Sequence, residues 1–220
     1  MRHGVMKRLI PAVCAVAAVA GALTACVPLV MGGAAAGTAL VAIDRRTSGA
    51  QLEDEGIELR AESRIRSNLG TRVRVSVTSY NRQVLLTGEV PNVQDKQLVE
   101  QVVSRVENVA SVVNELAVLS SPSLVERSSD LLLTGRVKAM LVDARDLQSS
   151  AFKVVTERGT TYLMGRVTQR EADRATEVVR STSGVQKVVR IFEIISEEEL
   201  TRLQPASAKP PVATDKPAGG

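Results

Sequence analysis

The residues of this chain best suited to covalent or acid–base chemistry lie close to its N-terminus. Of 220 residues, only His3, Cys14 and Cys26 are histidine or cysteine. A short basic start is followed by an uncharged apolar run from Leu9, and small residues stand directly before Cys26. This order of basic, apolar and small segments is typical of a secretory signal. We therefore predict that residues 1–25 are a signal peptide.

The four residues Leu23-Thr24-Ala25-Cys26 resemble the lipobox of bacterial lipoproteins. In that class the cysteine is acylated and becomes the new N-terminus, so the resemblance implies lipid attachment at Cys26. The next residue is Val27. In the enteric sorting scheme an aspartate there retains lipoproteins in the inner membrane, so its absence favours the outer membrane by analogy.

The apolar run continues past the predicted cleavage site, because residues 27–43 carry no charge. An uncleaved transmembrane anchor that begins at Leu9 is the alternative interpretation. Pro28 and Gly32 are poor helix formers and weaken it. We predict instead that residues 26–53 are a lipidated Gly/Ala-rich tether followed by a polar leader.

Removal of the signal and acylation of Cys26 leave little reactive chemistry. The mature chain lacks histidine, the usual general base near neutral pH. It also lacks a spare thiol for a disulfide, a nucleophile or a Cys₂His₂-type metal site. Glu157, Glu171 and Asp173 are carboxylates that we expect to be solvated on a charged helix face. We predict no enzyme activity, no catalytic residue, no metal and no cofactor.

The formal net charge of +4 is concentrated outside the predicted folded regions. Residues 44–122 contain ten basic and eleven acidic side chains, and residues 123–200 contain twelve of each. A nucleic-acid-binding surface needs clustered positive charge. Two tyrosines, two phenylalanines and no tryptophan also leave little for base stacking. We therefore predict no nucleic-acid partner.

An internal repeat organises the rest of the chain. Residues 84–90 (VLLTGEV) match residues 161–167 (TYLMGRV) at an offset of 77, and residues 108–113 match 184–189 at an offset of 76. A repeat of this length, present twice, indicates two similar small domains.

Hydrophobic periodicity predicts the same order of elements in both copies: helix, strand, strand, helix, strand. The fold class is therefore α+β, with two tandem αββαβ domains, each a three-stranded mixed sheet with two helices on one face. The predicted elements are 54–69, 72–78, 83–90, 92–106 and 110–119, and then 128–141, 151–157, 160–167, 169–182 and 185–195. The predicted segments are 1–25 signal, 26–53 tether and leader, 54–120 first domain, 121–127 linker, 128–200 second domain and 201–220 disordered Pro/Ala-rich tail.

Gly88 and Gly165 stand at the ends of the matching strands, before the second helix of each copy. Neither lies in a phosphate-binding glycine pattern. We interpret both as structural glycines that relieve a bend or a close approach.

The repeat resembles the BON domain. The residues that carry the resemblance are the central Leu-Leu-Thr-Gly and Leu-Met-Gly strands, residues 154–172, and the leader 44–54. Together with the lipobox, the arrangement is similar to dual BON-domain lipoproteins of the Gram-negative outer membrane. The resemblance implies a periplasm-facing, lipid-anchored protein that supports envelope integrity and whose second domain binds anionic, phosphatidylglycerol-like phospholipid.

In that family, lipid binding is assigned to the first helix of the second domain and to nearby loops, and the matching positions here are residues 129–141. The resemblance therefore implies a lipid site at this helix. An aromatic residue stands in the family at the position of Leu132. The candidate phospholipid-binding residues are Leu131, Leu132, Leu133, Arg136 and Lys138. Three consecutive helical residues spread over about 200°, so at least one leucine faces outward, and cations beside it suit an acidic bilayer.

Two alternatives remain open from the sequence. Leu132, Leu133 and Val137 could be the domain's own core stripe, since any packed helix shows such spacing. The paired domains could also act as an adaptor for an envelope assembly or chaperone partner, with the acyl chains as the sole lipid contact.

Overall fold

The computed structural model describes residues 44–119 and 124–203. The predicted signal peptide, Cys26 and most of the tether lie outside the described residues, as do 120–123 and 204–220. None of the helices within the described ranges combines the length and the apolar character that a membrane crossing needs.

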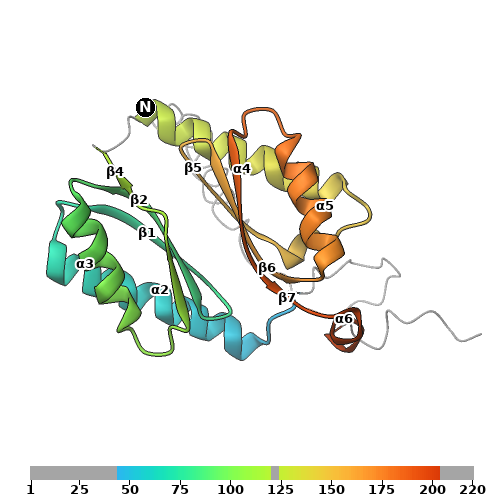
Figure 1. Ribbon diagram of the computed structural model, residues 1–220, viewed down its shortest axis with the longest axis horizontal. Helices are drawn as coiled ribbons and strands as arrows, with labels where there is room; N and C mark the ends of the chain where they lie inside the picture. Colours follow the sequence, from blue (N-terminus) through green and yellow to red (C-terminus); the bar gives the residue numbers. More distant parts are fainter. Residues whose placement is uncertain (1–43, 120–123, 204–220) are drawn as a thin grey trace, which may run out of the picture. The chain divides into compact units, whose positions relative to one another are not determined.

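The first domain has a mixed sheet with two helices on one face (Figure 1). Strand β1 pairs antiparallel with the central β2. Strands β3 and β4 pair parallel with successive parts of β2 and together form the third strand. The elements are α2 (Ser48–Leu69), β1 (Arg74–Tyr80), β2 (Gln83–Val90), α3 (Val93–Ser104), β3 (Ser111–Asn114) and β4 (Ala117–Val118).

The second domain repeats this topology, with β5 antiparallel and β7 parallel to the central β6. Its α5 begins with a capping box, in which Thr168 and Glu171 satisfy each other's backbone N–H groups. The elements are α4 (Leu124–Asp143), the short helix η1 (Ser149–Ala151), β5 (Lys153–Glu157), β6 (Thr160–Val167), α5 (Gln169–Arg180) and β7 (Lys187–Ile194), followed by α6 (Glu197–Leu203). The predicted α+β fold class is confirmed.

Each domain has its own apolar core between its helices and its sheet. In the first domain Ile57, Ala61 and Ile65 of α2 are buried at four-residue spacing, as a helix with one apolar face requires. They pack with Leu86 and Val90 of β2.

A third apolar cluster joins the two domains. Leu85 of β2 and Met164 of β6 are both fully buried. Each side chain points to the opposite face of its sheet from the adjacent residue, which belongs to the core of its own domain. The second sheet face of each domain therefore packs against the other domain. This explains why both central strands are buried on two faces and read as nearly continuous apolar runs. The cluster consists of Tyr80, Leu85, Tyr162, Met164 and Ile191.

The largest differences from the sequence prediction concern three helices. Helix α2 begins at Ser48 rather than 54, because the Thr47 side chain accepts the N–H of Ala50 and caps it. Helix α4 begins at Leu124 rather than 128. Helix α6 extends to Leu203, into the segment predicted as tail, with Leu200 buried. The differences at α2 and α6 come from local caps and contacts, which hydrophobic periodicity does not predict.

Candidate functional site

Helix α4 carries apolar side chains on two different faces. The inner face consists of Leu133, Val137 and Leu141, which are 6%, 0% and 1% exposed and belong to the core of the second domain. Leu133 was predicted as a lipid contact, and its burial shows that it is a core residue instead. The outer face, in contrast, is open to solvent.

The outer face of α4 exposes Leu131, Leu132 and Val142 by 74%, 71% and 65%. The alternative that places Leu132 in the core stripe is therefore wrong. Residues 131, 135, 138 and 142 follow one side of the helix, and 132, 136 and 139 follow the adjoining side. We define the outer face as Leu131, Leu132, Gly135, Arg136, Lys138, Ala139 and Val142, all of which are exposed.

Two cations flank these apolar residues. Lys138 and Arg136 lie on opposite sides of the strip between Leu131 and Leu132, because successive helical residues advance by about 100°. The Arg136 guanidinium donates a hydrogen bond to the carbonyl oxygen of Ser183 over 2.6 Å, which holds the side chain beside the helix. Large exposed apolar side chains with flanking cations form the usual arrangement of an interfacial helix.

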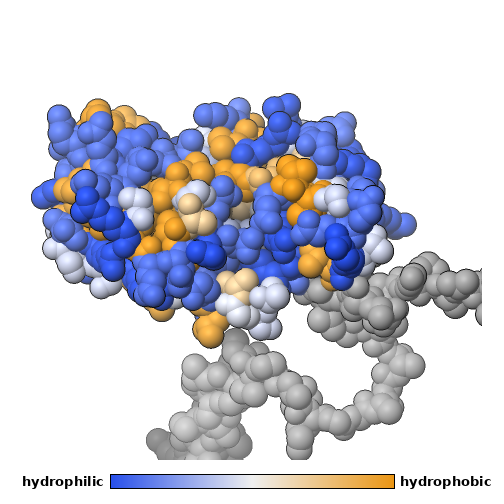
Figure 2. All heavy atoms as spheres, turned by 60° about the horizontal axis from the view of Figure 1, so that its bottom comes forward, coloured by the Kyte–Doolittle hydropathy of each residue, from blue (hydrophilic) through white to orange (hydrophobic). Residues whose placement is uncertain are grey.

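Figure 2 shows hydropathy on one face of the molecule, where hydrophilic surface surrounds separate hydrophobic areas. Isolated exposed apolar side chains are ordinary on soluble proteins. The outer face of α4 differs because three large ones share one helix surface with small residues between them.

The equivalent helix of the first domain provides an internal comparison. The core residues of α2 and α4 align at an offset of 76, with Ile57 against Leu133 and Ala61 against Val137. At the same offset, Leu131, Lys138 and Val142 correspond to Glu55, Glu62 and Arg66. The two helices thus share a buried pattern but place their exposed apolar side chains at different repeat positions, since α2 exposes Leu52 and Leu59 instead.

Comparison with known proteins identifies the repeat. A family model described as BON domain matches residues 54–120 and 129–195. The chain belongs to the BON-domain family. It is 39% identical over 176 residues to the outer membrane lipoprotein DolP of Haemophilus influenzae, which covers 79% of this chain and 90% of the relative. The predicted resemblance to dual BON-domain outer membrane lipoproteins is confirmed.

A second relative is the 21 kDa hemolysin of Actinobacillus pleuropneumoniae, 28% identical over 155 residues, or 70% of this chain and 80% of the relative. Neither relative is named as an enzyme. Among solved structures, CdsD of the Chlamydia trachomatis type III secretion system covers 70% of this chain and 96% of its own, with 15% identity and a TM-score of 0.28. A likeness this distant carries no functional argument.

An aspartate in each BON domain fixes the first helix to the strand hairpin. The Asp130 carboxylate of α4 accepts the N–H groups of Arg158 and Gly159 over 2.7 and 3.0 Å. The Asp54 carboxylate of α2 accepts the N–H groups of Asn81 and Arg82 over 2.7 and 2.8 Å. The turn residues have positive φ. Sequence reasoning missed this pair, although both aspartates occupy the same repeat position at an offset of 76.

Burial alone would raise the pKa of Asp54, but its hydrogen bonds outweigh burial. The Ser79 hydroxyl, the Arg82 backbone N–H and the Arg46 guanidinium each donate a hydrogen bond to the Asp54 carboxylate, so its pKa is held below its usual value. Asp54 is therefore a charged structural group that links α2 to the β1–β2 turn.

The two glycines of the matching strands lie against backbone. A Cβ on Gly88 would stand 2.1 Å from the carbonyl oxygen of Arg74, and Gly88 has a φ of 115°. A Cβ on Gly165 would stand 2.4 Å from the carbonyl oxygen of Ala151. At both positions the close approach excludes a side chain.

The acidic residues considered for chemistry have ion-pair partners. Asp173 is exposed and pairs with Arg190. The expectation of a solvated Glu171 is wrong, because this residue is 3% exposed and pairs with Arg45. The expectation also fails for Glu157, whose side chain is 16% exposed and lies on β5 beside Arg74, and burial raises its pKa. Each of these groups therefore takes part in a structural ion pair.

Proposed function

We propose that the second BON domain binds anionic phospholipid through the outer face of α4, and that this contact supports envelope integrity. The observation that carries the proposal is the simultaneous exposure of Leu131, Leu132 and Val142 beside Arg136 and Lys138. The leucines enter the headgroup layer, and the cations meet lipid phosphates.

The contact is weak by itself. Full burial of a leucine contributes about 1.5–3 kcal/mol, and each cation near an anionic surface contributes about 1 kcal/mol. A helix at the interface buries only part of each side chain, so the sum corresponds to reversible binding. Acylation at Cys26 supplies lasting attachment, because lipid chains contribute about 0.8 kcal/mol for each buried CH₂ group. The attached domain then works at high local lipid concentration, where a weak site suffices.

Vesicle flotation tests the proposal. The mature chain with Cys26→Ser lacks the acyl chains and keeps both domains, so the third apolar cluster stays covered. It is mixed with vesicles of phosphatidylcholine alone or with added phosphatidylglycerol, and we expect flotation with the anionic vesicles that weakens as salt is raised.

Equal flotation with both kinds of vesicle would contradict the anionic preference. If the protein binds neither kind, the lipid proposal fails, and the adaptor alternative gains support if an envelope protein is recovered in stoichiometric amount with the folded chain.

A further inference from the structure

Two consecutive arginines in the leader ahead of α2 reach different domains. Arg45 is 6% exposed and contacts the second domain. Its guanidinium donates to both carboxylate oxygens of Glu171 over 2.8 and 2.7 Å, and to the carbonyl oxygen of Arg166 over 2.9 Å. These partners lie 126 and 121 residues further along the chain. The leader is therefore tied to the second domain before the chain enters the first.

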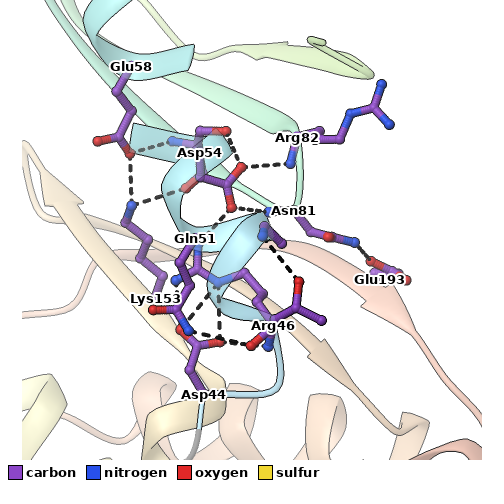
Figure 3. A network of polar contacts seen from close by, with 12 residues as sticks. Asp44, Arg46, Gln51, Asp54, Glu58, Asn81, Arg82, Lys153 and Glu193 are labelled. Carbon is purple, nitrogen blue, oxygen red and sulfur yellow. Dashed lines mark hydrogen bonds and ion pairs between the residues drawn. The ribbon is translucent and has the colours of Figure 1, made fainter. Parts of the chain in front are cut away.

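Arg46 contacts the first domain. Its guanidinium lies 2.7 Å from the Asp54 carboxylate and 4.3 Å from the centre of the Tyr80 ring. Asp44 accepts from the same guanidinium over 2.7 Å. Figure 3 shows Arg46, Asp44 and Asp54 in this network, next to Lys153 and Glu58. The two arginines thus place the leader at the joint between the domains.

Other ion pairs cross the joint, but in each of them at least one side chain is more open to water. The Lys153 ammonium donates to Glu58 over 2.8 Å, and these side chains are 36% and 27% exposed. The side chains of Arg45 and Glu171 are each 4% exposed. Exposed pairs contribute little to stability, whereas removal of one partner from a buried pair leaves an uncompensated charge and is strongly unfavourable.

We infer that Arg45 locks the second BON domain to the leader and, together with the shared apolar cluster, makes the two domains move as one body. Arg45 is a positioning residue, and its role does not depend on lipid binding. Arginine suits the site because its planar fork matches both oxygens of Glu171, while a lysine supplies a single point charge.

Distance measurements between two spin labels test whether Arg45 restricts the motion of the two domains. Ser63 of α2 and Ala139 of α4 are exposed on helices outside the joint. In the mature chain with Cys26→Ser, cysteines introduced at these two positions are the only thiols. We expect a narrow distance distribution in the parent protein, a clearly broader one with Arg45→Gln, and an intermediate width with Arg45→Lys.

Arg174→Gln is the matched control, since Arg174 pairs with Asp146 and Glu177 inside the second domain and is 41% exposed. It should leave the distribution unchanged. Glu171→Gln keeps an oxygen that can accept the Thr168 N–H of the capping box, so we expect this variant to fold. It replaces Arg45→Gln in the test if Arg45→Gln does not fold. We expect it to broaden the distribution as well. The inference is overturned if a folded Arg45→Gln protein has a distance distribution as narrow as that of the parent. If Arg45→Gln does not fold, the same result with Glu171→Gln overturns it.

Discussion

Leu132 lies on solvent-exposed helix surface, where a hydrophobic side chain gains nothing from the fold. It is 71% exposed, whereas Leu133 beside it is 6% exposed and belongs to the core. The two leucines therefore have different roles despite their adjacency. Leu133 stabilises the domain, and Leu132 is available to an external apolar phase.

We predict that Leu132→Glu lowers the apparent affinity for phosphatidylglycerol vesicles, measured by flotation, by about tenfold or more. The substitution removes apolar burial and adds a negative charge that the anionic lipid repels. Leu59→Glu is the matched control, since Leu59 is 69% exposed on α2 of the first domain. Circular dichroism should show both variants folded. Equal loss of flotation in the two variants would assign the effect to net charge and not to α4.

Gly165→Ala should destabilise the second domain by about 1–3 kcal/mol, since the new Cβ would overlap the Ala151 carbonyl oxygen. Urea unfolding measures the change. Gly135→Ala is the control, because no atom lies within 4 Å of its added Cβ. Alanine there should be neutral or slightly stabilising in a helix. A Gly165→Ala protein as stable as the parent would show that the strand can shift to make room.

At the residue scale, the sequence predicted that a leucine of α4 faces outward but not which one. The answer depends on how the helix packs, and the alignment of Leu133 with Ile57 in the other repeat was the available signal. The buried pair of Arg45 and Glu171 could not be predicted, because its members are 126 residues apart and no periodicity links them.

Asp54 and Asp130 show at the scale of elements how each first helix is held. Each carboxylate accepts two backbone N–H groups of a hairpin turn, so the turn and the helix are fixed together. In the second domain this link sets the rotation of α4, and hence the direction of its outer face.

Acid should weaken the first domain through Asp54. Its pKa is lower in the folded protein than in the unfolded chain, so its stabilising contribution is complete above the unfolded value of about 4 and is lost as pH falls through the folded value. Asp54→Asn should cost about 2 kcal/mol or more at neutral pH and make stability less dependent on pH below 4.

Urea unfolding at several pH values measures this effect. Glu55→Gln controls for the change in charge, because Glu55 is the next residue on the exposed side of α2. If Asp54→Asn retained the parent's acid sensitivity, other carboxylates would have to account for it.

The order and type of the main elements could be predicted, because helical and alternating periodicities recur in both copies. The early start of α2 and the added α6 could not, since they depend on Thr47, Ser196 and Leu200 rather than on a repeated pattern. The interruption between β3 and β4 was also absent from the prediction, and there Glu115 still donates its N–H to the carbonyl oxygen of Leu86.

At the scale of the whole molecule, the two domains are mutually dependent. Tyr162, Met164 and Ile191 of the second domain are 5%, 0% and 6% exposed because the first domain covers them. The isolated second domain would present these residues to water.

We therefore predict that an isolated fragment 124–203 self-associates and floats with neutral as well as anionic vesicles, whereas the tandem keeps the anionic preference. Analytical ultracentrifugation and flotation of the two proteins side by side measure this. A monomeric fragment with the lipid preference of the tandem would show that the shared cluster is dispensable.

We propose that α4 meets the bilayer with its outer face. This proposal is tested most directly by the paramagnetic broadening of NMR signals in the lipid-free tandem chain by spin-labelled phosphatidylglycerol bicelles. We expect broadening at Leu131, Leu132 and Val142, and none at Leu52 or Leu59, which are equally exposed on α2. Broadening of α2 signals instead of α4 signals, or of signals from neither helix, would contradict the proposed contact.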